Sequence, residues 1–212
     1  MEKTKFIIIA GPQSSGKTTA FDHIKKRYPD AIFLEEINPY TFNKTHLGGA
    51  FVGKALEMKI VEEDLKRLES LTSACEKKKS NLAFIVQETG IFHLVYCEGL
   101  FEKRYLRRYY QKYLKIYNHF DVFVLFIDTK PSCSWSRRKY IYIERIKKLG
   151  IRKKKEKVVM PERYRRKIET LYPLWLRWYK KVPYKKTIIK NSKKDLPAFL
   201  KSIELFVKNV VG

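Results

Sequence analysis

Short apolar runs alternate with longer segments of helical periodicity along this chain. Five runs read as strands bounded by turn residues: Phe6–Ala10, Ala31–Leu34, Leu82–Val86, Asp121–Ile127 and the segment KTIIKN at 186–191. Strands that are apolar throughout and alternate with helices are typical of a parallel sheet covered on both faces. We therefore expect an α/β protein with a three-layer α/β/α arrangement around a five-stranded parallel sheet.

The segments between these runs predict helices over 18–28, 51–71 and 91–119, and a further helix after Asp195, which we expect to be its N-cap with Pro197 in the first turn. The aromatic segment 91–119 is expected to be one long helix, packed on its own sheet or in a homodimer. One more helix is expected before the fifth strand. It carries five large residues on one face, and Pro173 should kink it: Tyr164, Ile168, Leu171, Trp175 and Trp178.

Length and composition favour a single domain, 1–212, with a hydrophobic share of 44% that is ample for a core. The N-terminal apolar run is too short for a secretory signal, and no run approaches membrane-spanning length. Three widely spaced cysteines and four histidines suggest neither a disulfide framework nor a metal site. These features lead us to expect a cytoplasmic protein with reduced thiols and no membrane partner.

The net charge of +24 is unevenly distributed. Between Arg137 and Lys167 there are 15 basic and three acidic residues, so half of the net charge lies in this segment. A basic cluster of this size favours an anionic partner over a general lysine bias. Within it, 152–157 is the one candidate for a mobile segment.

The most specific motif begins where the first strand ends. Gly11 to Thr18 matches G-x-x-x-x-G-K-[ST] in full, with a strand before it and a helix after it. Glycines let such a loop curl so that its N–H groups and the helix N-terminus face phosphates. Lys17 can bridge the β- and γ-phosphates, and the Thr18 hydroxyl can bind Mg²⁺. The expected ATP-binding residues are Gly11, Gln13, Ser14, Ser15, Gly16, Lys17, Thr18 and Thr19.

The motifs typical of other protein classes that contain this loop are missing. The segment NKTH at Asn43 lacks the aspartate of a GTPase base-recognition motif, and no D-x-x-G follows a strand. The third strand ends in Gln-Glu rather than the Asp-Glu of a motor ATPase. A small-molecule kinase requires less: the loop, a carboxylate near the acceptor and a cationic lid.

Several segments resemble one group of kinases in their order and spacing. They are FIIIAGPQSSGKTT, LEEINPY, VQETGIF, LFIDTKPSCSWSRR and EKVVMPERYRRKIETLYPLWLRW. Together they resemble the deoxynucleoside kinase and thymidylate kinase group of P-loop kinases over most of the chain. The resemblance implies an ATP- and Mg²⁺-dependent transfer of a phosphoryl group to a nucleoside or nucleotide.

The resemblance also implies roles for three acidic residues. The carboxylate that ends the second strand acts as a base for the acceptor hydroxyl, and here it is Glu36, or Glu35 if the register differs by one. Glu88, which ends the third strand, would serve the Mg²⁺ shell together with Thr18. Thr89 stands where the group has an arginine, which is a departure from the pattern.

In the same group a proline after the fourth strand is followed six residues later by an arginine that opens a basic lid. Pro131 and Arg137 fit this spacing, so we expect a lid insertion at about 137–160. Arg137, Arg138 and Arg145 are the candidates to clamp phosphates, since the guanidinium fork suits phosphate oxygens. Asn191 is expected beside the adenine of ATP.

The pocket for the acceptor base transfers least well. The glutamine that the group carries on the helix after the second strand has no counterpart over 51–71, where Lys54 and Glu57 are polar but could simply face solvent. A stacking slot for the base has five candidates, although aromatics at such spacing are more often core: Tyr40, Phe42, Phe51, Phe92 and Tyr96.

Three functions remain open on the sequence. The first is a kinase for a nucleoside or nucleotide. The second is a kinase or NTPase that acts on nucleic acid, for example at a 5′ end, and binds it through the basic lid. The third is a nucleotide-binding module without catalysis.

Overall fold

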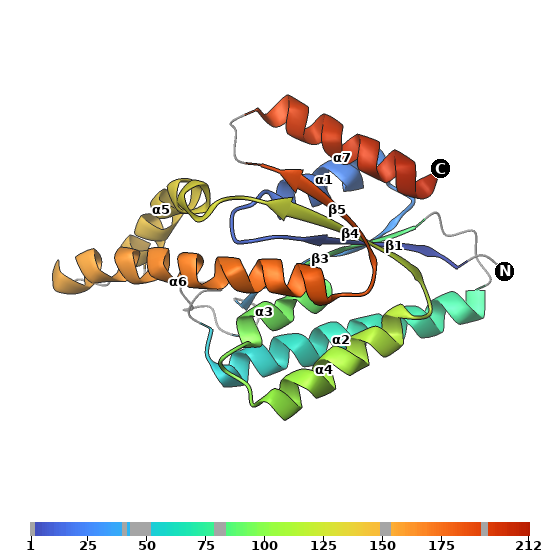
Figure 1. Ribbon diagram of the computed structural model, residues 1–212, viewed down its shortest axis with the longest axis horizontal. Helices are drawn as coiled ribbons and strands as arrows, with labels where there is room; N and C mark the ends of the chain where they lie inside the picture. The colour runs from blue at the N-terminus through green and yellow to red at the C-terminus, as the bar shows by residue number, and fades with distance from the viewer. Residues whose placement is uncertain (1–2, 40–41, 43–51, 79–83, 149–153, 192–194) are drawn as a thin grey trace.

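The computed structural model describes residues 3–39, 42, 52–78, 84–148, 154–191 and 195–212, and five strands lie in these ranges. They form one sheet in the order β2-β3-β1-β4-β5, and every neighbouring pair is parallel (Figure 1). This confirms the predicted α/β class and the five-stranded parallel sheet. The strands are β1 Lys5–Ala10, β2 Ile32–Leu34, β3 Ile85–Glu88, β4 Asp121–Asp128 and β5 Lys185–Lys190.

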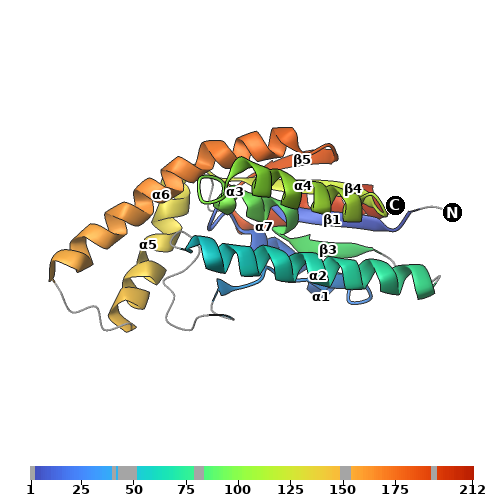
Figure 2. The same cartoon turned by 90° about the horizontal axis from the view of Figure 1, so that it is seen from below.

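Helices cover both faces of the sheet, as the three-layer prediction requires (Figures 1 and 2). Helices α1 and α7 lie on one face, while α2, α3, α4 and part of α6 lie on the other, and α5 projects beyond the sheet. The helical elements are α1 Lys17–Arg27, α2 Lys54–Lys78, η3 Gly90–His93, α3 Leu94–Cys97, α4 Lys103–Tyr117, α5 Pro131–Lys148, α6 Lys154–Lys181 and α7 Leu196–Val211.

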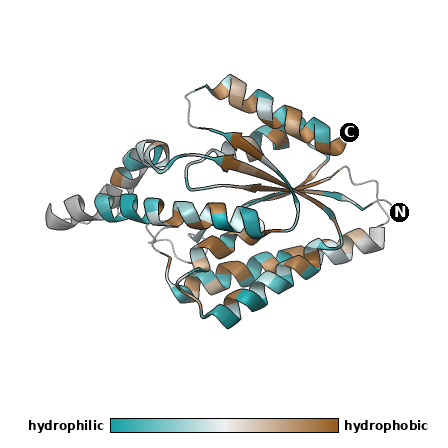
Figure 3. Cartoon of the chain, viewed as in Figure 1, coloured by the Kyte–Doolittle hydropathy of each residue, from teal (hydrophilic) through white to brown (hydrophobic). Residues whose placement is uncertain are grey.

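Alternation along β1 divides the interior into two cores. Ile7 and Ile9 face α1 and α7, whereas Phe6 and Ile8 face the layer of α2, α3, α4 and α6. Because successive side chains of a strand point to opposite faces, a strand buried on both faces must be apolar at every position. In Figure 3 the central strands are mostly hydrophobic, and the helices that surround them carry hydrophilic residues on their outer faces.

The prediction of one helix over 91–119 is wrong. The chain forms the short η3 and α3, turns through Gly99 at a φ of +85°, and begins α4 at Lys103. A left-handed φ ends a helix and suits glycine. The aromatic face of α4 packs in the chain's own core, where Tyr113 and Tyr117 are fully buried.

The last two helices largely follow the prediction. The five large residues from Tyr164 to Trp178 are all buried on one face of α6. The helix continues through Pro173, which is exposed, so the carbonyl left without an amide partner lies on the side of α6 that faces water. Asp195 caps α7 by accepting a hydrogen bond from the Ala198 amide at 3.0 Å.

Some predictions fall on residues outside the described ranges. The third strand, expected from Leu82, is described from Ile85 onward, and of the segment 152–157 only the helical backbone of 154–157 is described. No helix in the described part of the chain is long and apolar enough to cross a membrane.

Candidate active site

The loop between β1 and α1 has a backbone that only small residues can adopt. Gly16 has a φ of +102°, and Ser14 has a φ of +56°. A Cβ on Gly16 would lie 2.7 Å from Nδ2 of Asn191, and one on Gly11 would lie 2.4 Å from the carbonyl oxygen of Ile127. The two glycines of the motif are therefore required by conformation and by the close approach of β4 and of Asn191.

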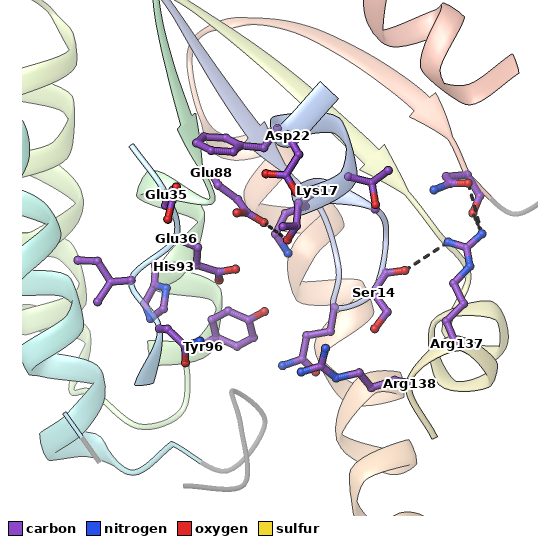
Figure 4. Close-up of a pocket in the computed structure, with 18 of the residues that line it drawn as sticks. Ser14, Lys17, Asp22, Glu35, Glu36, Glu88, His93, Tyr96, Arg137 and Arg138 are labelled. Atoms are coloured by element: carbon purple, nitrogen blue, oxygen red, sulfur yellow. Dashed lines mark hydrogen bonds between the residues drawn. The ribbon is translucent and has the colours of Figure 1, made fainter. Parts of the chain in front are cut away.

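Side chains from α5 and from the end of β5 hold this loop in place. Asn191 donates through Nδ2 to the carbonyl of Ser15 at 2.6 Å. Arg137 donates to the carbonyls of Ser14, at 3.3 Å, and Asn191, at 2.8 Å. Both residues thus support the loop, and in this structure the Arg137 donors are directed at backbone oxygens rather than into the cavity (Figure 4).

Two further contacts join the loop to helices α5 and α6. Ser134 donates its hydroxyl hydrogen to the carbonyl of Gln13, and Tyr164 donates to the side-chain Oε1 of Gln13 at 3.1 Å. The predicted nucleotide-binding loop is consequently tied at three residues, Gln13, Ser14 and Ser15, before any ligand is present. A fixed loop loses little conformational entropy on binding phosphates.

Lys17 and Ser15 are placed to receive an anion. The Lys17 side chain is only 6% exposed, and its ammonium donates to the Gly11 carbonyl at 3.3 Å. The Ser15 hydroxyl is buried and has no hydrogen-bond partner among the described residues. A buried donor without a partner costs free energy, so this loop fits a ligand rich in acceptor oxygens, such as a triphosphate.

Thr18 and Glu88 bring two oxygen ligands together at the end of the loop. The Thr18 hydroxyl donates to Glu88 Oε1 at 2.7 Å, although the residues are 70 positions apart. Burial and the charge of Glu36 raise the pKa of Glu88, while Lys17 acts in the opposite direction. Mg²⁺ prefers one or two protein oxygens together with water and substrate phosphates, and this pair fits that preference.

The structure separates the two candidate bases at the end of β2. Glu35 is exposed and forms an ion pair with Lys25 at 2.9 Å, and this hydrogen bond lowers the pKa of Glu35. Glu36 is only partly exposed and lies close enough to Glu88 and His93 to influence the pKa of both. In Figure 4 Glu36 lies on the side of the cavity that faces Lys17. Of the two, Glu36 is the one placed to meet an acceptor.

Of the two roles that the sequence leaves open for Glu57, the structure excludes the solvent-facing one. Its side chain is 1% exposed, and its carboxylate lies 2.7 Å from Nε2 of His93. Burial disfavours the charged imidazole, but the carboxylates of Glu57, Glu36 and Asp64 outweigh this and raise the pKa of His93. Glu57 and His93 form a buried hydrogen-bonded pair in the cavity wall. The sequence offered no signal for it, because the partners lie on α2 and η3, 36 positions apart.

A second buried network fixes the end of β3. Gln87 donates through Nε2 to both carboxylate oxygens of Asp64, at 2.9 and 3.0 Å. Tyr113 donates to Asp64 at 2.8 Å, and Tyr117 donates to Gln87 Oε1 at 2.6 Å. Desolvation raises the pKa of Asp64, and these hydrogen bonds partly offset it. The network holds the strand end that carries Glu88.

One cavity of about 900 Å³ joins these groups (Figure 4). It is lined by the loop, by Glu35, Glu36, Glu57 and Glu88, and by His93, Tyr96, Arg137, Arg138 and Asn191. Arg138 lies across from Tyr96 in Figure 4. Nearly all predicted site residues therefore meet at the carboxyl end of the sheet, where α/β proteins bind ligands.

The aromatic candidates for the base-stacking slot lie in different environments. Tyr96 lines the cavity, while Phe92 is fully buried and stacks on Trp175 with ring centroids 6.1 Å apart. Phe42 is 39% exposed. Tyr40 and Phe51 lie outside the described residues, and the side chain of Arg145 is likewise not described.

Comparisons with known proteins agree with this geometry. The family model for deoxynucleoside kinase matches residues 7–211. Comparison with curated proteins gave no match. One similar solved structure is the YorR protein from Bacillus subtilis in complex with phosphorylated GDP, with 13% identity, a TM-score of 0.55 and coverage of 96% of this chain and 95% of that one. Another is the deoxyadenosine kinase from M. mycoides with bound dATP, with 18% identity, a TM-score of 0.50 and coverage of 96% and 98%.

The two structural likenesses bear on the fold, which is the same doubly covered parallel sheet. The family match spans almost the whole chain, and it agrees with the phosphate loop, the strand-end carboxylates and the cavity that they share. The chain belongs to the deoxynucleoside kinase family, and it is a P-loop phosphotransferase.

Proposed function

We propose that the protein transfers the γ-phosphoryl group of ATP to a hydroxyl group of a nucleoside, with Mg²⁺ as cofactor. The observation that carries this proposal is the placement of Glu36 and the phosphate loop in the walls of one cavity. A carboxylate and a phosphate-binding loop that share a cavity are the two parts that an in-line transfer to a hydroxyl requires.

The loop residues bind the donor. The amides from Gln13 to Lys17 and the N-terminus of α1 face the β- and γ-phosphates, and the Lys17 ammonium neutralises charge on the transferred group. The buried Ser15 hydroxyl gains a partner when phosphate oxygens arrive. Thr18 and Glu88 hold Mg²⁺, which supplies charge neutralisation between the phosphates when it is bound.

Glu36 acts on the acceptor. Its carboxylate accepts the hydrogen of the attacking hydroxyl and orients that oxygen toward the γ-phosphorus. Glu35 does not share this role, because its exposed carboxylate is paired with Lys25. The proton moves from the hydroxyl to Glu36 as the new oxygen–phosphorus bond forms and the bond to the β-phosphate oxygen breaks.

The arginines of the predicted lid have different roles. Arg138 lines the cavity and is the nearest described lid residue to offer its guanidinium to the transferred phosphoryl group. Arg137 positions the loop through the carbonyls of Ser14 and Asn191. Arg145 remains a candidate from its spacing alone.

The acceptor lies between Tyr96 and the Glu57–His93 pair. Tyr96 offers a ring for a flat base, and the buried Glu57–His93 pair offers polar contacts deep in the wall. Thr89, which replaces the family's arginine, is buried, and its hydroxyl has no partner among the described residues. His93, in the turn that follows Thr89, is a titratable group that lines the same cavity.

A phosphate-transfer screen tests the proposal. The purified protein is incubated with labelled ATP and Mg²⁺ against nucleosides, nucleoside monophosphates and oligonucleotides with a 5′-hydroxyl. We expect turnover with a nucleoside, and its loss when EDTA removes Mg²⁺. Turnover with the oligonucleotide alone would move the function to nucleic acid, and ATP binding without any turnover would indicate a non-catalytic module.

A further inference from the structure

The outer face of α4 carries a dense positive charge that the kinase reaction does not use. Within this helix the exposed positions hold six cations, one glutamine and no acid. We call the six cations the α4 basic face: Lys103, Arg104, Arg107, Arg108, Lys112 and Lys115. This segment lies outside the basic stretch of the lid, so it is a second concentration of positive charge in the protein.

The charges on this face are barely neutralised from within the protein. Arg104 pairs with Glu102 at 2.9 Å, and the other five cations form no ion pair with another described residue. On α6, by contrast, Arg165 and Arg166 both pair with Glu162, at 2.8 and 3.4 Å. A surface that is merely solvated is usually interleaved with opposite charge, as on α6.

Two acids close to α4 are already engaged by other side chains. Glu62 of α2 accepts a hydrogen bond from Tyr109 at 2.9 Å. Glu98, before α4, binds both Arg177 and the indole of Trp178. The basic face therefore keeps most of its charge.

Repulsion within the face destabilises the helix that carries it. Lys103 and Arg107, Arg104 and Arg108, and Arg108 and Lys112 are like charges four positions apart. Each such pair costs a few tenths of a kcal/mol. The opposite side of α4 is tightly packed through Tyr109, Tyr110, Tyr113, Ile116 and Tyr117, which hold the helix in place despite the repulsion. A ligand with several negative charges would relieve this cost.

The basic surface continues onto the end of α6. Tyr110 donates to the carbonyl of Lys181 at 3.2 Å, which joins the two helices. The Lys181 ammonium lies 4.4 Å from the centroid of the Tyr110 ring, and both Lys180 and Lys181 are exposed. The cations thus cover two adjoining helices.

We propose that the α4 basic face docks the phosphate backbone of nucleic acid, without regard to sequence. Arginine and lysine are the residues that contact phosphates in such complexes. From Lys103 to Lys115 the helix rises about 18 Å, which matches about five steps of a duplex at 3.4 Å per step. The occupant is thus an extended polyanion rather than one small phosphate ligand.

Two other occupants fit the face less well. A helix that enters a membrane surface inserts apolar side chains, but the apolar side of α4 is buried in the core, and its exposed positions are all polar. A second copy of the chain, docked about a twofold axis, would place one set of like charges against another. Helix α4 lies in the layer that covers one face of the sheet (Figures 1 and 2), and none of its six cations lines the cavity, so occupancy leaves the cavity open.

The experiment compares two triple variants that remove the same charge. Arg107→Gln, Arg108→Gln and Lys112→Gln are combined in one protein, and Lys26→Gln, Lys201→Gln and Lys208→Gln, all exposed on α1 and α7, are combined in the control. Binding to a labelled 20-base-pair duplex is followed by fluorescence anisotropy over a range of salt concentrations. Circular dichroism and thermal unfolding check that both variants fold.

We expect the α4 variant to bind the duplex about tenfold more weakly at low salt and to lose about 2 to 3 from the slope of log K against log salt. The control should keep the slope of the unmodified protein within about 1. Equal losses in both variants would overturn the proposal, since net charge alone would then explain binding. A normal duplex slope in the α4 variant, with weakened binding to vesicles of anionic phospholipid, would also overturn it.

Discussion

The two halves of the cavity are built in different ways. The phosphate-binding half is a continuous piece of backbone, shaped by Gly11 and Gly16 and tied by neutral or cationic side chains such as Asn191 and Arg137. The acceptor half is assembled from side chains that follow β2 or lie on β3, α2 and η3, and three of its polar groups are acids: the partly exposed Glu36 and the buried Glu57 and Glu88.

This difference predicts different sensitivities. The conformation of the phosphate half is set by sterics, so it responds to the addition of a single methyl group. The acceptor half is set by charge, so it responds to pH and to the exchange of a carboxylate for an amide. Substitutions on each side should therefore separate donor binding from acceptor chemistry.

The largest effect is expected from Lys17→Ala, on the phosphate half. Loss of the ammonium removes charge neutralisation in the transition state, and the rate of transfer should fall by roughly 100- to 1,000-fold. Among the described residues, the Lys17 ammonium donates one hydrogen bond, to the Gly11 carbonyl, so thermal unfolding should change little. Single-turnover transfer from labelled ATP measures the rate, with Lys26→Ala as an exposed control on the same helix. A fully active Lys17→Ala variant would remove the loop from the mechanism.

The next effect distinguishes the bases on the acceptor half. Glu36→Gln should lower kcat by about 100-fold or more, because an amide cannot accept the acceptor's proton. Glu35→Gln should lose only an exposed ion pair, which is worth well under about 1 kcal/mol. Steady-state kinetics with the acceptor found in the screen compare the two. Similar minor losses in both variants would place the base elsewhere.

A methyl group tests the steric character of the phosphate half. Gly16→Ala places a Cβ 2.7 Å from Asn191 Nδ2 at a left-handed φ, which should cost about 1 to 3 kcal/mol and weaken ATP binding roughly tenfold. Gly53→Ala is the matched control, since its Cβ would meet nothing within 4 Å. Isothermal titration measures the affinity for ATP, and thermal unfolding measures the loss of stability. Equal affinities for the two variants would mean that the loop relaxes freely.

The smallest effect concerns pH. Because burial and Glu36 raise the pKa of Glu88 in the folded state, the folded protein holds this proton more tightly than the unfolded chain does. The resulting stabilisation is complete below the ordinary glutamate pKa and is lost as the pH rises through the folded-state value. Glu88→Gln should therefore raise the unfolding midpoint at pH 8 by a few degrees, and by less at pH 5.

The measurement is thermal unfolding in EDTA, without nucleotide. With Mg²⁺ and ATP the order should reverse, because the carboxylate then binds the ion. A Glu88→Gln variant that is less stable than the unmodified protein at pH 8 in EDTA would show that the charged Glu88 carboxylate does not destabilise the free site.

The phosphate half could be predicted from the sequence because its information is local. Eight consecutive residues, with an apolar strand before them, determine a loop whose geometry follows from backbone sterics. The buried stripe from Tyr164 to Trp178 and the cap at Asp195 were predicted for the same reason, since each depends on spacing within one helix.

The acceptor half could be predicted only in part. Glu36 and Glu88 follow from their positions at strand ends, but the pairing of Glu57 with His93 depends on how α2 crosses the sheet and on where the chain turns into η3. The aromatic periodicity of 91–119 predicts one long helix, but the chain turns at Gly99 and forms separate helices on its two sides. Contacts between distant elements carry no signature in a single sequence.

The position of Trp175 gives the protein an internal optical reporter. This indole is 1% exposed, and the Lys17 ammonium lies 5.7 Å from its ring centroid. A nucleotide that draws the ammonium toward its phosphates changes the electric field at the ring, and indole emission responds to such a change. Occupancy of the loop can then be followed in real time in the unlabelled enzyme, with Trp175→Phe as the silent reference.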